Sequence, residues 1–272
     1  MDAARSVLIT GCSTGIGRAT ALRLAGSGWT VYATARRVET LGELEAAGCR
    51  VMALDVTDEA SMEAAVAQVA APLGALINNA GYSLSGALET LPMEEVRRQF
   101  ETNVFGLLRL TQLVLPQMRE ARGGRIVNLS SMGGRLTFPG GGAYHATKWA
   151  VEALSDVLRV EVAPFGIDVI VVEPGLIKSE FGETAAAGVS DGGPYAAFNE
   201  SVAKATRGIY EGPAARLGGG PEVVAEAIEK ALERRRAPTR VPVTASARIM
   251  MGLHAVLPDR LWDRAVKGSF DL

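Results

Sequence analysis

The amino-acid sequence predicts an α/β fold in which a doubly wound, mostly parallel sheet is flanked by helices and followed by a C-terminal helical lid. Over the first two-thirds of the chain, short β-rich runs alternate with longer amphipathic segments, as expected for parallel strands joined by crossover helices. The runs are rich in β-branched residues, which indicates burial on both faces of the sheet. A glycine-rich segment, Thr10–Gly17, follows the first run directly.

Seven short runs are strand candidates, and four longer segments between them are helical candidates. The strand candidates are Ser6–Thr10, Thr30–Ala33, Arg50–Ala53, Ala75–Asn78, Arg125–Leu129, Asp168–Val172 and Arg240–Val243. The helical candidates are Ile16–Ala25, Ser61–Val69, Glu94–Arg119 and Tyr144–Val162. Helices of these lengths would cover both faces of the sheet, and such sheets bind ligands at the carboxyl ends of their strands.

The segment between Gly182 and Gly220 is rich in Gly, Ala and Ser and loses clear periodicity, so the sequence assigns no secondary structure there. A segment this long inside a compact domain is more often functional than idle, so we expect a mobile cover. An ordinary surface connection is the alternative.

Length and composition favour one ordered globular domain. The chain has 272 residues, of which 48% are hydrophobic and 21% are charged, and no repeat or linker divides it. We expect a single domain over residues 1–272, with a core at about 5–179 and a lid and C-terminal cover at about 180–272. The net charge of −2 supplies no broad basic field, so nucleic acid is not an expected partner.

Cysteine content and hydropathy bear on the compartment. Only Cys12 and Cys49 are present, and the start of the chain lacks a secretory pattern, so we expect a reduced, cytoplasmic protein. No apolar run approaches the roughly 20 residues that a membrane-spanning helix needs. The apolar tail Ile249–Leu257 leaves two interpretations open, peripheral contact with a membrane and packing in a core or substrate lid.

The segment Thr10–Gly17 reads TGCSTGIG and joins the first strand candidate to the first helical candidate. Glycines permit a tight turn and the close approach of a pyrophosphate, while the helix start offers unpaired N–H groups and a favourable dipole. A strand-to-helix turn that binds nothing is the alternative. The flanking elements favour nucleotide binding.

Tyr144 and Lys148 are four positions apart at the start of a helical candidate, so their side chains lie on one face. A free tyrosine titrates near about pH 10, and a neighbouring ammonium favours its phenolate. Tyr144 can therefore exchange protons near neutral pH.

Several segments, taken in order, resemble the single-domain branch of the short-chain dehydrogenase/reductase family. They are the GxxxGxG loop, Asp55-Val56, Asn78-Asn79-Ala80-Gly81, Asn103, Ser131, the run from Tyr144 to Lys148, and Pro174-Gly175. Their order and spacing match the family from about Arg5 to Ser179. The TGCSTGIG and VYATAR phrases are similar to the hydroxysteroid and retinol dehydrogenase side of the family. The resemblance implies a Rossmann-type oxidoreductase that binds a nicotinamide cofactor.

The resemblance implies that Asp55 meets the adenine amino group, that Val56 lines the adenine pocket and that the NNAG segment closes the fourth strand. Two alternatives stay open, namely that Asp55 only caps the helix starting near Asp58 and that Asn78-Asn79 only forms a turn. The implied cofactor contacts are Gly11, Ser13, Gly15, Ile16, Gly17, Arg36, Asp55, Val56, Asn79, Tyr144, Lys148, Pro174, Gly175, Ile177 and Ser179.

The residues after the second strand candidate predict the type of nicotinamide cofactor. NAD-selective members of the family usually carry an acidic residue there, whereas this chain continues to Arg36 and Arg37. A guanidinium suits a ribose 2′-phosphate through paired, charge-assisted hydrogen bonds. We therefore predict NADP(H), with Arg36 as the main contact, Ser13 as a candidate phosphate neighbour and Arg37 as a solvated charge.

The resemblance implies hydride transfer between nicotinamide and a carbonyl or alcohol carbon. Tyr144 would exchange a proton with the reacting oxygen, while Lys148 would hold the nicotinamide ribose. Ser131 is similar to the family's substrate-positioning serine, and its spacing to Tyr144 selects it over Ser130. Asn103 is similar to the residue that supports a proton relay through Lys148.

The segment from Pro174 to Ser179 resembles the family's loop at the nicotinamide carboxamide, with Ser179 where Thr is common. Beyond it, a candidate lid could enclose an apolar substrate or simply pack the helices over the sheet. The lid candidates are Tyr195, Phe198, Ile209 and Tyr210. Broad reduction of aliphatic or aromatic ketones is as compatible with the sequence as a steroid substrate.

Partners and other functions complete the expectations. The long helices resemble elements through which family members associate, so a homodimer or homotetramer is expected. His145 and His254 form no ligand cluster, so no metal is required. Two alternatives stay open, an NADP(H)-binding regulatory or scaffold protein without turnover and another reaction on the same fold, such as dehydration or epimerisation.

Overall fold

The computed structural model describes residues 4–70, 72–178 and 193–270, without the side chains of residues 209–211, 213 and 214. Its centre is a parallel sheet with the strand order β3-β2-β1-β4-β5-β6-β7, which confirms the predicted α/β class. The strands are β1 (Ser6–Ile9), β2 (Thr30–Ala35), β3 (Arg50–Ala53), β4 (Ala75–Asn78), β5 (Gly124–Leu129), β6 (Ile167–Pro174) and β7 (Arg240–Val243). All seven strand candidates are thereby confirmed, with small changes at their ends.

The strand order reverses between β1 and β4. Each pairs in parallel with the other, with Leu8 opposite Leu76, while β2 lies on the far side of β1. Both leucines are fully buried, because helices cover the two faces of the sheet. The carboxyl ends of β1 and β4 therefore open a crevice, the position at which doubly wound sheets bind ligands.

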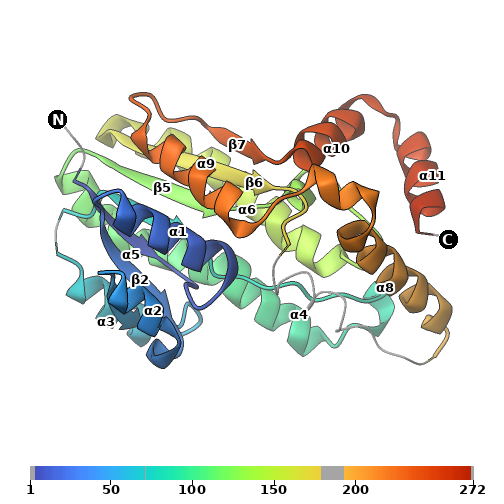
Figure 1. Cartoon of the computed structure of the whole chain (residues 1–272), viewed down its shortest axis with the longest axis horizontal. Coiled ribbons are helices and arrows are strands. Elements are labelled where there is room, and N and C mark those ends of the chain that lie inside the picture. Colours follow the sequence, from blue (N-terminus) through green and yellow to red (C-terminus); the bar gives the residue numbers. More distant parts are fainter. Residues whose placement is uncertain (1–3, 71, 179–192, 271–272) are drawn as a thin grey trace.

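One face of the sheet is covered by α1 (Gly15–Gly26) and α9 (Pro221–Glu233), which lie in front of it in Figure 1. Leu24 of α1 and Ile228 of α9 are fully buried in one apolar cluster with the strands. The short helix α2 (Gly42–Ala46) contributes to the same cluster. Burial of such side chains stabilises the fold by about 1.5–3 kcal/mol each.

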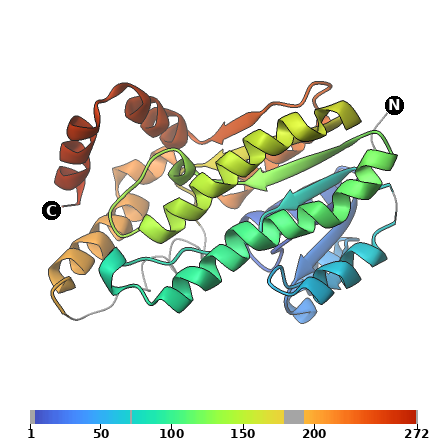
Figure 2. The ribbon, with the colours of Figure 1, turned by 180° about the vertical axis from the view of Figure 1, so that it is seen from behind.

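The other face is covered by α3 (Glu59–Gln68), α5 (Gly106–Glu120) and α6 (Gly142–Val162), as Figure 2 shows from behind. A second apolar cluster forms there from side chains of these helices and of the strands. Short 3₁₀ turns at Val38–Leu41, Leu88–Thr90, Met132–Gly134 and Ala163–Phe165 join the larger elements.

The single helix expected at Glu94–Arg119 is interrupted. It consists of α4 (Met93–Phe100), a π-helical turn at Glu101–Phe105 and α5, in one continuous run. Single π-turns inside helices occur frequently at functional sites. Asn103, a predicted site residue, lies inside this turn.

The second half of the segment Gly182–Gly220, to which the sequence assigned no secondary structure, is largely helical, in agreement with the predicted helical lid. Residues 179–192 lie outside the described residues, but α8 (Ala196–Glu211) and a 3₁₀ turn (Pro213–Leu217) follow them. Alanine, which made the segment look aperiodic, is the strongest helix former.

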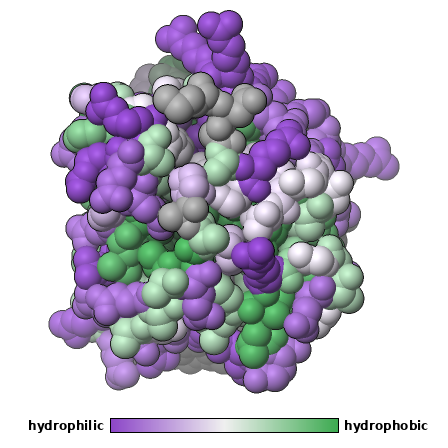
Figure 3. Space-filling view, turned by 90° about the vertical axis from the view of Figure 1, so that its left-hand side faces the viewer, coloured by the Kyte–Doolittle hydropathy of each residue, from purple (hydrophilic) through white to green (hydrophobic). Residues whose placement is uncertain are grey.

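The chain ends in α10 (Ala245–Val256) and α11 (Asp259–Ser269), which lie with α8 near the carboxyl ends of the strands (Figure 1). Figure 3 shows the opposite end, at which hydrophilic side chains surround smaller apolar patches. Among the helices of the described residues, none is long and apolar enough to cross a membrane. The tail Ile249–Leu257 forms most of α10 and is partly exposed, with Val256 at 75%.

Candidate active site

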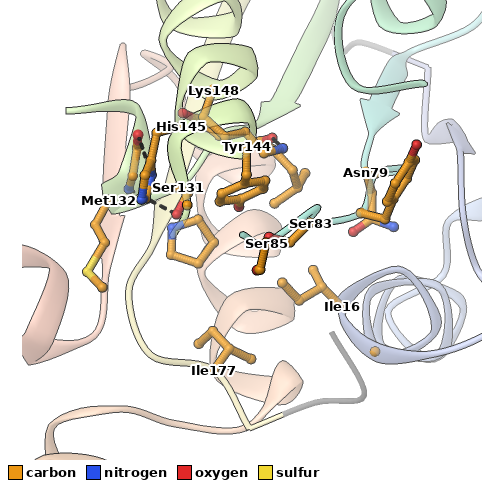
Figure 4. Close-up of a pocket in the computed structure, with 18 of the residues that line it drawn as sticks. Ile16, Asn79, Ser83, Ser85, Ser131, Met132, Tyr144, His145, Lys148 and Ile177 are labelled. Carbon is orange, nitrogen blue, oxygen red and sulfur yellow. Dashed lines mark hydrogen bonds between the residues drawn. The ribbon is translucent and has the colours of Figure 1, made fainter. Parts of the chain in front are cut away.

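A cavity of about 950 Å³ lies at the carboxyl ends of the strands. Its lining joins the glycine-rich loop at one side to the amino-terminal turn of α6 at the other. Figure 4 shows Ile16 and Asn79 on one side and Tyr144, Lys148 and Ser131 facing them. The predicted site residues that line the cavity are Gly11, Ser13, Gly15, Ile16, Arg36, Asp55, Val56, Asn79, Ser131, Tyr144, Lys148, Pro174, Gly175 and Ile177.

Two predicted site residues lie behind the lining, and one lies outside the description. Gly17 and Asn103 are absent from the cavity wall but contact residues that form it. Ser179 falls among the residues that the structure does not describe. The structure therefore brings most of the predicted site residues to one cavity, while their roles stay predictions.

The glycine-rich loop has the backbone that its residues predict. Gly11 and Gly15 have φ angles of 70° and 57°, which residues other than glycine rarely adopt. A Cβ on Gly17 would collide with the Gly11 carbonyl oxygen, so only glycine lets α1 start this close to the loop. Thr14 caps α1 without a side-chain hydrogen bond, which leaves the first N–H groups of the helix for an anion. This cradle fits a dinucleotide pyrophosphate.

Asn79 fixes the loop to the end of β4. Its Nδ2 donates to the Thr10 and Gly11 carbonyl oxygens at 2.8 and 3.0 Å, while Thr10 Oγ1 accepts from the backbone N–H groups of Asn79 and Ala80. The interpretation of Asn78-Asn79 as a simple turn is therefore too narrow. Thr10 is a positioning residue that the sequence analysis missed, although it opens the glycine motif.

Asp55 and Val56 lie in the cavity wall after β3. Asp55 Oδ1 accepts from the N–H and the hydroxyl of Thr57 at 2.9 and 2.7 Å. The helix cap is a different residue, because Asp58 accepts from the N–H groups at the start of α3. The alternative in which Asp55 caps this helix is wrong, since the true cap stands three residues later.

The two arginines after β2 differ in position. Both are exposed, but Arg36 lines the cavity, whereas Arg37 does not and instead precedes the turn at Val38–Leu41. Ser13 lines the same cavity. The geometry thus separates a candidate phosphate contact from its neighbour in the way that the sequence analysis expected.

Tyr144 and Lys148 lie in the first two turns of α6. The Lys148 ammonium lies 5.7 Å from the centre of the Tyr144 ring and donates to the Leu129 carbonyl oxygen at 2.7 Å. Lys148 is buried, which lowers its pKa to about 8, while the nearby Glu152 raises it. A cation held this close favours the phenolate form of Tyr144.

Asn103 is buried and held from three sides. Its Nδ2 donates to the Tyr82 carbonyl oxygen at 2.9 Å and to Thr147 Oγ1 at 3.1 Å, and its Oδ1 accepts from the Tyr82 N–H at 3.1 Å. A Cβ on Gly81 would lie 3.0 Å from Asn103 Oδ1 and 3.8 Å from Lys148 Nζ. Both side chains therefore lie next to Gly81, Lys148 in the cavity lining and Asn103 behind it.

Ser131 follows β5 and caps the turn Met132–Gly134, where its Oγ accepts from the Gly133 N–H at 3.0 Å. Its hydroxyl proton stays available for a second partner. Ser130 is more deeply buried and also lines the cavity. The selection of Ser131 over Ser130 as the substrate-positioning serine stays a prediction.

His145 is a positioning residue that the sequence analysis considered only as a metal ligand. Its Nδ1 lies 3.1 Å from the Gly133 carbonyl oxygen, and its Nε2 accepts from the Phe138 N–H at 3.2 Å. Burial lowers the pKa of His145 to about 4. The neutral ring thus joins the turn Met132–Gly134 to the loop before α6. The position of His145 next to Tyr144 in the sequence is the signal that could have indicated this role. No cluster that could hold a metal occurs within the described ranges.

The segment after β6 approaches α10. A Cβ on Gly175 would lie 2.5 Å from Thr244 Oγ1 and 2.7 Å from the Ala247 nitrogen, so glycine is required there. Ile177 forms a bridge with Gly219, and the Lys178 N–H donates to the Gly219 carbonyl oxygen at 2.9 Å. This segment therefore closes one side of the cavity.

The lid differs from the expectation in its residues. Tyr195 and Phe198 pack against each other and do not line the cavity, and Tyr195 donates to Glu89. The side chains of Ile209 and Tyr210 lie outside the description. The apolar end is lined instead by Met132, Phe138, Val202, Leu217, Ile249, Met250 and Phe270.

Comparison with known proteins agrees with this geometry. The family model described as short chain dehydrogenase matches residues 5–189, so the chain belongs to the short-chain dehydrogenase/reductase family and is an oxidoreductase of it. Figure 4 shows four residues of the segments that resemble the family around one cavity, namely Asn79, Ser131, Tyr144 and Lys148.

Three relatives match almost the whole chain. The uncharacterized oxidoreductase YbbO of Escherichia coli is 35% identical over 97% of this chain and 94% of its own length. A 3-ketodihydrosphingosine reductase of Bacteroides thetaiotaomicron is 36% identical, with 96% of each chain covered. An NADPH-dependent 3-dehydrocapnine reductase of Ornithobacterium rhinotracheale is 31% identical, with 96% of this chain and 95% of that protein covered.

The solved structures that match the fold include the following two. A short-chain dehydrogenase of Streptomyces avermitilis has a TM-score of 0.81 and 38% identity, and the match covers 100% of this chain and 97% of that one. A closed form of serine dehydrogenase complexed with NADP+ has a TM-score of 0.76 and 30% identity, with 87% and 93% covered.

Proposed function

We propose that this protein is an NADP(H)-dependent oxidoreductase that interconverts a ketone or aldehyde and the corresponding alcohol, with Tyr144 as the acid and base. The observation that carries the proposal is the single cavity that holds a dinucleotide cradle at one side and Tyr144, Lys148 and Ser131 at the other. The cradle is positioned to hold the pyrophosphate, and bound NADPH would supply the hydride.

The chain's own residues would then manage the proton and the orientation. Ser131 and Tyr144 would donate hydrogen bonds to the reacting oxygen, and Tyr144 would transfer its proton as the alkoxide develops. The Lys148 cation, buried beside Tyr144, would stabilise the phenolate that remains. Asn103 would position Lys148 from behind the cavity wall.

The position of Arg36 supports a preference for the phosphorylated cofactor. Arg36 lines the same cavity as Ser13, and its guanidinium suits a ribose 2′-phosphate. Two relatives named above carry NADPH or NADP+ in their names, in agreement with this choice.

The apolar end of the cavity supports an apolar substrate. Apolar side chains from α8, α10 and the residue that follows α11 line this end, beside the hydroxyl groups of Thr206, Ser246 and Ser269. The ketoreductase relative of Bacteroides thetaiotaomicron acts, by its name, on a 3-ketodihydrosphingosine. We propose a carbonyl group on a long apolar chain as the substrate class.

A fluorescence titration with NADPH and NADH tests the cofactor without a choice of substrate. Arg36→Ala should weaken NADPH binding by about 1.5–3 kcal/mol, the range for a charge-assisted hydrogen bond, and leave NADH binding nearly unchanged. Arg37→Ala is the matched control, because Arg37 is adjacent but outside the cavity. Equal loss in both variants would contradict the assignment of Arg36.

A series of aliphatic ketones of increasing chain length then tests the reaction. Turnover with NADPH should rise with chain length as the apolar end fills, and the product should be the alcohol. Tyr144→Phe should abolish turnover while retaining NADPH binding. Unchanged turnover in that variant would contradict the proposed role of Tyr144. A dehydrated or epimerised product from the wild type would contradict the proposed carbonyl reduction.

We also propose a homodimer or homotetramer. Support comes from large apolar side chains that stay exposed on the π-turn and on α6, namely Phe105, Trp149, Val157 and Val160. Light scattering of the purified protein measures the mass directly.

A further inference from the structure

Two buried carboxyl groups lie behind Lys148, outside the cavity lining. Glu152 is on α6, one helical turn beyond Lys148, and Glu173 is the penultimate residue of β6. They are 5% and 2% exposed. Burial of two acids side by side is unfavourable unless charge, hydrogen bonds or protonation compensates it.

The hydrogen bonds of the two acids are incomplete. Glu152 Oε2 accepts from Arg240 Nε and Nη2 at 3.1 and 3.0 Å. Within the described part of the chain, however, Oε1 of Glu152 and Oε1 of Glu173 have no hydrogen-bond partner. The nearest cations to Glu173 Oε1 are Arg240 at 3.5 Å and Arg135 at 3.9 Å, too far for good hydrogen bonds.

Arg240 contacts both carboxyl groups, at 3.0 Å from Glu152 Oε2 and 3.5 Å from Glu173 Oε1. A proton on one of the two groups would supply the donor that their unpartnered oxygens lack, because a protonated acid donates and an ionised neighbour accepts. The pKa of Glu173 is raised to about 7, first by burial and then by the negative charge of Glu152, while the cations Arg135 and Arg240 lower it. Two carboxyl groups that cannot both ionise commonly hold one proton.

We propose that Glu152 and Glu173 share one proton and act as positioning residues that set the pH range over which Lys148 stays charged. The inference rests on the role of Lys148 in the proposed function. Glu152 is the acid that interacts with Lys148, and Glu173 determines whether the pair carries one negative charge or two.

The charges around the pair come from each element packed against it. Arg240 reaches it from β7, Arg135 follows the Met132–Gly134 turn, and α6 contributes Lys148 and Asp156. As the pH rises, Glu173 loses the shared proton first. The added negative charge then favours the Lys148 ammonium, so Lys148 keeps its proton in a range where burial alone would remove it.

Difference infrared spectroscopy tests the shared proton without nucleotide or substrate. Near neutral pH the wild-type protein should show the carbonyl stretch of a protonated, buried carboxylic acid, and Glu173→Gln should lack it. Glu152→Gln should also lack it, because Glu173 then ionises at lower pH, and this variant serves if Glu173→Gln does not fold. Persistence of the band in the folded variants would overturn the shared proton.

The pH dependence of NADPH binding tests the effect on Lys148. In Glu173→Gln the loss of affinity on the alkaline side should begin at least about half a pH unit lower than in the wild type, since one charge is missing near Lys148. Asp156→Asn is the matched control. Asp156 lies on α6 like Glu152 and also accepts hydrogen bonds from Arg240, but it is half-exposed. An equal shift in both variants, or none in Glu173→Gln, would overturn the proposal. Absence of NADPH binding in the wild type would instead defeat the proposed function and leave the infrared result to decide the shared proton.

Discussion

Gly17 is the glycine of the cofactor loop whose replacement the structure constrains most. A Cβ there would collide with the Gly11 carbonyl oxygen and lie 2.5 Å from Asn79 Nδ2. Neither neighbour is free to move, because Gly11 has a φ of 70° and Asn79 Nδ2 already donates to the Thr10 and Gly11 carbonyl oxygens. Gly17→Ala must therefore shift α1 or break these hydrogen bonds.

The expected cost follows from these contacts. Overpacking costs about 1–3 kcal/mol, and loss of the Asn79 hydrogen bonds costs about 1–3 kcal/mol more. The higher helix propensity of alanine returns up to about 1 kcal/mol. The net loss in the free energy of unfolding is then about 1–6 kcal/mol, or at least about 2 °C in Tm for a chain of this size. The affinity for NADPH should fall as well, because the same shift moves the cradle.

Thermal unfolding of wild type, Gly17→Ala and Gly26→Ala measures this cost. Gly26 is the control, because it ends the same helix and nothing lies within 4 Å of an added Cβ. Gly26→Ala should leave the Tm unchanged or raise it by up to the equivalent of about 1 kcal/mol. If both variants unfold at the wild-type temperature and bind NADPH equally, the packing argument for Gly17 is refuted.

Two further predictions concern buried titratable groups, each measured by denaturant unfolding at several pH values. Burial lowers the pKa of Lys148 to about 8, so a charged Lys148 destabilises the folded protein below that pH. Lys148→Met should therefore stabilise the protein below pH 8, by about 3 kcal/mol from the pKa shift alone, and this gain should shrink as the pH rises toward 10.5. A gain that stays constant with pH would contradict the lowered pKa. His145→Gln should cost about 1–3 kcal/mol near neutral pH, because it loses the hydrogen bonds with Gly133 and Phe138. Burial lowers the pKa of His145 to about 4, so the wild type loses stability as the pH falls from 6.5, and the difference from the variant should narrow over that range. If the stability difference between wild type and variant instead widens as the pH falls, His145 is not neutral in the folded protein.

The sheet was predictable because its signal is local. Each strand reads as a short β-branched run, and burial on both faces leaves little ambiguity. The glycine loop and the Tyr144–Lys148 spacing were equally visible, since a positive φ and a shared helix face follow from residue type and separation.

The features that sequence reasoning missed depend on partners far along the chain. The amphipathic pattern from Glu94 to Arg119 runs through the π-turn without a break, so the sequence gives no sign of the turn. What distinguishes the turn is the pair of hydrogen bonds from Asn103 to Tyr82 and Thr147, which are distant in the sequence. Similarly, Glu152 looks like a helix surface residue until Arg240 of β7 is placed against it. Local patterns carry no record of such tertiary bonds.

The space left by Gly81 lies where three segments of the site approach one another, namely the segment after β4, the helix with the π-turn and α6. Gln99 and Asn103 are four residues apart on one helix face, and both donate to the Tyr82 carbonyl oxygen, at 3.0 and 2.9 Å. They therefore hold the segment after β4 from behind, at the place where the strand order reverses. A side chain at Gly81 would crowd both Asn103 Oδ1 and Lys148 Nζ. A glycine there thus lets the π-turn and α6 both approach the segment after β4, so the geometry of the candidate catalytic group depends on the switch point of the sheet as much as on α6 itself.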